Sequence, residues 1–62
     1  MLGKQIRYYR KLKRLTQENL AEKAELAPSY LSDVERGREN VSIDALNRIA
    51  KAVGKTLRDL FI

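Results

Sequence analysis

The sequence contains no cysteine and no histidine among its 62 residues. A disulfide framework, a thiolate or histidine metal site, and catalysis by either side chain are therefore excluded. No apolar run approaches the ~20 residues that span a membrane. The chain begins with MLGKQIRYYRK, which lacks the apolar region of a signal peptide. We therefore expect a cytoplasmic protein that needs no cofactor or metal and has no membrane partner.

An enzyme is not expected either. The carboxylates are scattered over positions predicted to face solvent, and the sequence has no glycine-rich phosphate loop. A chain of 62 residues forms one small domain that buries only about 60% of its unfolded surface. We therefore treat residues 1–62 as a single domain without a deep catalytic cleft.

The net charge of +5 is distributed unevenly along the chain. Residues 1–16 carry six basic side chains and no acid, whereas residues 17–36 have a net charge of −3 and residues 37–62 one of +2. A local positive field is what a polyanion-binding surface requires. An excess of basic side chains often does no more than keep a protein soluble. It therefore supports nucleic-acid binding only where the basic residues lie beside an element that could read bases.

Apolar residues recur at helical spacing in five segments, the last of them short, and no segment has the alternating pattern of a strand. Thr16, Ser42 and Thr56 each precede such a segment and are predicted N-caps. Gly37 and Gly54 are predicted to end two of the helices. The fold class is therefore all-α, with helices predicted at residues 2–13, 17–24, 28–36, 43–53 and a short one after residue 56.

The second and third of these helices form a pair with a short turn at residues 25–27. The inner faces are small and apolar, whereas the outer face of the third helix is polar. A major groove about 12 Å wide admits one α-helix, and a second helix packed across it sets the angle of entry. The outward residues of the third helix are Ser29, Ser32, Asp33 and Arg36, and the inward ones are Leu31 and Val34.

The run LTQENLAEKAELAPSYLSDVERGREN resembles the helix-turn-helix of the phage repressor and Cro family, also called the XRE type. The similarity continues through VSIDALNRIAKAVG and covers nearly the whole chain. It implies a compact five-helix, lambda-repressor-like DNA-binding domain with the helix-turn-helix at residues 17–36. The docking geometry that it implies is the one known for the phage repressors themselves, whose second motif helix lies in the major groove.

The resemblance also implies roles for individual residues. Arg10 and Glu35 match a structural pair that ties the first helix to the third. The positions that match base-reading residues are Gln17, Ser29, Ser32 and Asp33. Those that match contacts to the DNA backbone are Arg10, Gln17, Pro28, Tyr30, Arg36, Arg38 and Asn40. The plainer alternatives are that the two serines are only solvated and that Asp33 pairs with Arg36.

Two positions depart from the family pattern, which has glycine where this chain has Arg14 and Glu25. Both can hold a left-handed conformation at a cost of roughly 1 kcal/mol, so neither breaks the motif. Apart from Arg36, the third helix offers no side chain that pairs bidentately with a base. The preferred DNA sequence therefore does not follow from this face.

These features predict a sequence-specific transcriptional regulator of bacterial or phage origin, associated with the nucleoid. Two copies would read a roughly palindromic operator, with half-sites about 34 Å apart.

The dimer surface would include Leu60, Phe61 and Ile62 unless the first two pack into the core. The run SYLSDVERGREN also resembles the controller proteins of restriction-modification systems, which would make an activator or autoregulator equally plausible. A further alternative is an antitoxin or protein-interaction module on the same fold.

Overall fold

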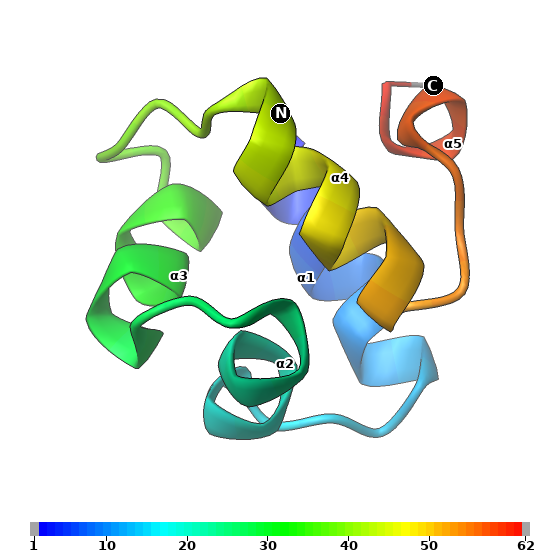
Figure 1. Cartoon of the computed structure of the whole chain (residues 1–62), viewed down its shortest axis with the longest axis horizontal. Helices are drawn as coiled ribbons and strands as arrows, with labels where there is room; N and C mark the ends of the chain where they lie inside the picture. The colour runs from blue at the N-terminus through cyan, green and yellow to red at the C-terminus, as the bar shows by residue number, and fades with distance from the viewer. Residues whose placement is uncertain (1, 62) are drawn as a thin grey trace.

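The computed structural model describes residues 2–61 and has the all-α fold predicted from the sequence. Its described residues form no strand, and none of their helices is long and apolar enough to cross a membrane. Three helices end one residue earlier than predicted. The elements are α1 (Leu2–Leu12), α2 (Gln17–Ala24), α3 (Pro28–Glu35), α4 (Ile43–Ala52) and α5 (Leu57–Leu60) (Figure 1).

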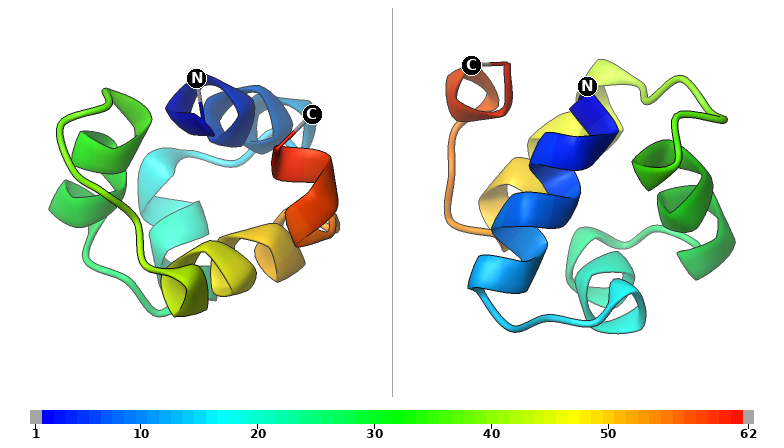
Figure 2. Two further views of the ribbon diagram at one scale, coloured as in Figure 1. Left: turned by 90° about the horizontal axis from the view of Figure 1, so that it is seen from above. Right: turned by 180° about the vertical axis from the view of Figure 1, so that it is seen from behind.

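The helices surround one small core. Viewed from above, α1 and α4 lie on opposite sides, with α3 at one end and α5 at the other (Figure 2). Helix α2 packs against both α3 and α4, and α1 contacts α3 and α5. This arrangement leaves the outer side of α3 open to solvent. The largest fully buried side chains are Ile6, Leu20, Leu31, Leu46, Ile49, Val53 and Leu60.

Two apolar residues whose spacing predicts a place in the core are exposed instead. Ile43 has the spacing of the apolar face of its helix, but it is the first residue of α4 and is 67% exposed. Phe61 follows the single turn of α5, in which Leu60 already fills the inward position, and is 63% exposed. The prediction that Phe61 packs into the core is therefore wrong. Ile62 lies outside the described residues.

The predicted helix starts are confirmed. The hydroxyl oxygens of Thr16 and Ser42 accept the backbone N–H of Asn19 and Ala45, at 3.0 and 3.1 Å. Thr56 and Asp59 form the capping box. The backbone N–H that Thr56 donates to the Asp59 carboxylate lowers the pKa of that carboxyl group. The small stabilisation that results is present at neutral pH and is lost as the pH falls through this lowered pKa.

Non-glycine residues occupy two left-handed positions, as expected. Arg14 has φ of 57° and Glu25 has φ of 58°. Each conformation costs an L-residue about 1–2 kcal/mol. Gly37 follows α3 with φ of 76°, where it allows the chain to leave the helix without this cost. The short turn between α2 and α3 is thus kept at some local strain.

A close backbone contact between α1 and α3 was not predicted. Gly3 is buried where α1 crosses the last turn of α3. A Cβ atom at this position would lie 2.5 Å from the carbonyl oxygen of Val34 and 2.6 Å from that of Glu35. Only glycine leaves room for this approach, which sets the position of the C-terminal end of α3.

Candidate nucleic-acid interface

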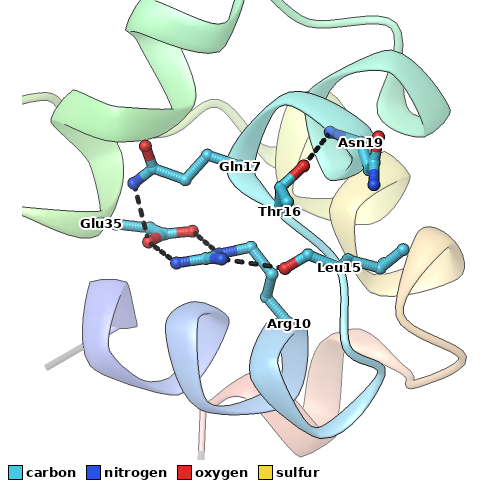
Figure 3. A network of polar contacts seen from close by, with 6 residues as sticks. All are labelled: Arg10, Leu15, Thr16, Gln17, Asn19 and Glu35. Carbon is cyan, nitrogen blue, oxygen red and sulfur yellow. Dashed lines mark hydrogen bonds and ion pairs between the residues drawn. The ribbon is translucent and has the colours of Figure 1, made fainter.

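A buried ion pair joins α1 to the last turn of α3. Nε of Arg10 donates to Oε2 of Glu35 at 2.7 Å, and Nη2 donates to Oε1 at 3.0 Å (Figure 3). The two side chains are only 10% and 3% exposed. The pair that the resemblance implied is therefore present, with the bidentate geometry that makes such pairs strong.

Arg10 also holds the connection between α1 and α2. Its Nη1 donates to the carbonyl oxygen of Leu15 at 2.9 Å. Three of its five N–H groups are thus used within the protein. Its buried position gives it a structural role, while the predicted contact between Arg10 and a DNA phosphate stays a prediction.

Gln17 is a third member of this network. Its Nε2 donates to Oε1 of Glu35 at 3.1 Å (Figure 3). Gln17 was expected to contact DNA, and nothing in the sequence indicated its contact with Glu35. Eighteen residues separate the two side chains, so only the packing of α2 against α3 reveals it.

The outer face of α3 has the predicted arrangement. Leu31 and Val34 are buried in the core, whereas Ser29 is exposed and Ser32 and Asp33 are half-buried. The alternative in which Asp33 pairs with Arg36 is not seen. Within residues 2–61, the ion pairs are Arg10 with Glu35 and the exposed Asp44 with Arg48. The Asp33 carboxylate consequently remains available on this face.

An open hollow lies between the first turns of α2 and α3. Its position is suited to an anion, because backbone N–H groups at both helix starts lack partners within their helices. At α3 the N-cap is Ala27, which has no side chain to accept them. Glu18 is the one acidic group at the rim. The residues that line the hollow are Arg10, Leu15, Thr16, Gln17, Glu18, Pro28 and Ser29.

The other residues expected to contact the DNA backbone differ in their surroundings, since Tyr30 lies in the first turn of α3 and the rest follow its last turn. Tyr30 is half-buried against the core, and its hydroxyl oxygen accepts the backbone N–H of Ser42 at 3.4 Å. It therefore helps to attach α3 to the start of α4. Arg36, Arg38 and Asn40 are all exposed in and after the last turn. Their side chains are free to reach a neighbouring polyanion.

No group of acidic side chains suited to a metal ion occurs among residues 2–61.

Comparison with known proteins decides the family. A family model described as helix-turn-helix matches residues 6–60. The chain belongs to this helix-turn-helix family. The immunity repressor protein of Bacillus phage phi105 is 49% identical over 53 residues, which cover 86% of this chain and 37% of the repressor. The control protein C.BamHI of Bacillus amyloliquefaciens is 41% identical over 61 residues, 97% of this chain and 75% of that protein.

Solved helix-turn-helix structures share the whole fold. The restriction-modification controller protein C.AhdI of Aeromonas hydrophila gives a TM-score of 0.95 at 40% identity, over 97% of this chain and 91% of that one. SinR, the master regulator for biofilm formation, in a crystal structure with DNA, also gives 0.95, at 38% identity over all of both chains. The five-helix DNA-binding fold and the resemblance to phage repressors and controller proteins are thereby confirmed. The named relatives are regulators and not enzymes.

Proposed function

We propose that this helix-turn-helix protein is a transcriptional regulator that binds double-stranded DNA sequence-specifically. The observation that carries the proposal is the outer face of α3, which is polar and open while its inner face is fixed by the core and by the buried Arg10–Glu35 pair. Rigid support on one side and short polar groups on the other suit a helix that enters the major groove. The relative SinR, whose structure contains DNA, supports this reading.

Ser29, Ser32 and Asp33 would contact base edges. A serine hydroxyl can serve any base, and a carboxylate accepts from N4 of cytosine. Asp33 is repelled by phosphates but forms no ion pair within residues 2–61 that DNA binding would break, so its carboxylate is free to accept from a cytosine. The DNA backbone would be held at the hollow by Pro28 and the start of α2, beside it by Tyr30 in the first turn of α3, and at the other end of α3 by Arg36, Arg38 and Asn40.

Similarity to controller proteins supports a second candidate function. C.BamHI is 41% identical to this chain and C.AhdI is 40% identical. Activation or autoregulation is therefore proposed beside repression. An antitoxin or interaction module would be indicated instead if the protein bound no DNA at about 50 mM salt, where nonspecific binding is strong.

Selection of bound sequences from a random DNA pool tests the reading face. We expect Ser32→Ala and Asp33→Ala each to change the preference at one or two base pairs, because each removes a hydrogen-bonding group that would face a base edge. Asp33→Ala should also bind nonspecific DNA more tightly, because it removes a charge that phosphates repel. Asn47→Ala, at an exposed position on α4, is the control. An unchanged preference in both variants would show that this face does not read bases.

We also propose that the protein acts as a homodimer, with Phe61 in the contact. Of the two described C-terminal candidates, Leu60 is buried and Phe61 is exposed. One 62-residue module offers little surface for high specificity alone. Sedimentation velocity should show that Phe61→Ser raises the dimer dissociation constant at least tenfold. Leu12→Ser, at a residue 59% exposed on α1, should leave it unchanged. Equal effects of the two changes would place the dimer contact elsewhere.

A further inference from the structure

We propose that Gln17 acts as a positioning residue for α3, through Glu35, and does not read a base. The inference rests on the proposed DNA-binding function and refines the site within it. Gln17 is the first residue of α2, and its carboxamide reaches across to the last residue of α3. Gln17 would therefore affect DNA recognition by setting the orientation of the whole of α3.

Three donors contact the Glu35 carboxylate. One oxygen accepts from Nη2 of Arg10 at 3.0 Å and from Nε2 of Gln17 at 3.1 Å. The other accepts from Nε of Arg10 at 2.7 Å. Because the Glu35 side chain is only 3% exposed, water replaces these donors poorly. A carboxamide that donates to a buried carboxylate is held more firmly than one at a neutral acceptor.

The Gln17–Glu35 contact connects the two helices of the helix-turn-helix at the ends that the turn does not join. At one end, the turn at residues 25–27 joins the last residue of α2 to the first of α3. At the other end, Gln17 joins the first residue of α2 to the last of α3 (Figure 3). Core packing and the Arg10–Glu35 pair already hold the two helices against each other. The Gln17 contact adds a direct polar connection at the end away from the turn, so it helps to set the angle of α3 and the depth at which α3 enters a groove.

This role predicts a different pattern of effects from a base contact. A base reader that is lost relaxes the preference at one position of the site. A change in the angle of α3 moves Ser29, Ser32 and Asp33 together. The contact at every base pair of the site is then weakened, while the preferred DNA sequence stays the same. The hydrogen bond from Nε2 to the buried carboxylate fixes the direction of the Gln17 carboxamide, so the side chain cannot swing freely toward a base.

The same side chain lies at the open hollow. Gln17 and Arg10 both line it, and both hold Glu35. A phosphate held there by the backbone N–H groups of the two helix starts would lie beside the two side chains that set the end of α3. A backbone contact at the hollow and base contacts along α3 are thereby coupled through Glu35.

The test uses Gln17→Met, which keeps the length of the side chain and removes its hydrogen bond. Asn19→Met, at an exposed position of the same helix, is the matched control. For each variant the preferred DNA sequence, the affinity for that sequence and the affinity for an unrelated duplex are measured. Backbone amide chemical shifts of the DNA-free protein are recorded at residues 35 and 36.

For Gln17→Met we expect about tenfold weaker binding to the preferred sequence, about 1.4 kcal/mol, because α3 is no longer held in the pose that the groove requires. The preferred sequence should be unchanged, nonspecific affinity should stay within twofold, and the shifts at residues 35 and 36 should move without DNA. Relaxation at a single base pair would overturn the proposal in favour of a reader, and unchanged affinity would overturn it as well. Absence of any DNA binding by the unmodified protein would reject the proposed function instead, while the shifts would still report on the Gln17–Glu35 connection.

Discussion

Glu35→Ala is expected to lower the free energy of unfolding by about 3–5 kcal/mol, because it leaves the Arg10 guanidinium buried without its counter-charge. The Arg10 side chain is 10% exposed and cannot turn to water without disturbing the carbonyl of Leu15. At roughly 0.05–0.15 kcal/mol per residue, the whole domain has only about 3–9 kcal/mol of stability. A large fraction of the variant should therefore be unfolded at 25 °C.

Urea denaturation followed by circular dichroism measures this loss. Asp44→Ala is the control, since it breaks the exposed pair with Arg48 and should cost only about 0.3–0.5 kcal/mol. The double change Arg10→Met with Glu35→Leu should be far less harmful than Glu35→Ala alone, because no buried charge remains. If Glu35→Ala cost no more than Asp44→Ala, the buried pair would not hold α3.

Gly3→Ala is expected to cost at least 1–3 kcal/mol, the range for inserting a methyl group into filled space. The added carbon would meet two backbone carbonyl oxygens at 2.5 and 2.6 Å, and neither can move as a flexible side chain could. Helix α1 would have to shift away from α3, which would also lengthen the bonds between Arg10 and Glu35. We therefore expect the variant to lose DNA binding together with stability.

The comparison that isolates this clash is Gly37→Ala. A Cβ atom at Gly37 meets nothing within 4 Å, so only its φ of 76° opposes the change, at about 1–2 kcal/mol. Alanine is a better helix former than glycine by roughly 1 kcal/mol, which favours Gly3→Ala in the absence of a clash. Thermal unfolding that showed Gly3→Ala to be stabilising would mean that α1 and α3 are not in close contact.

Local signals made most of the fold predictable. Each N-cap acts within three residues, and Thr16, Ser42 and Thr56 all lie where the sequence predicted. The exposed Ile43 and Phe61 were misplaced because periodicity assigns a face to a helix but not the point where its neighbours end. That point depends on the length of α5 and on the position of α4, which are set by packing.

The site was predictable to a different degree. The outer face of α3 follows from helical spacing, and the Arg10–Glu35 pair came from the resemblance to a family. The contact of Gln17 with Glu35 and the approach at Gly3 could not be predicted, because each depends on which backbones meet after folding. The assignment of Ser29, Ser32 and Asp33 to bases stays a prediction.

Helix α3 has eight residues and no side-chain cap at its start. Isolated helices shorter than about 12–15 residues are marginal in water, so this one persists only while α1 and α2 are docked on it. The unfolded chain thus has nothing shaped to enter a groove. Under the proposed function, specific DNA would bind the folded form, and at a hundredfold excess over Kd it would add about 2.7 kcal/mol to the stability of the domain. Occupancy of the DNA site and survival of the fold would then be linked, and the bound protein would be protected from the unfolding and proteolysis that its free form risks.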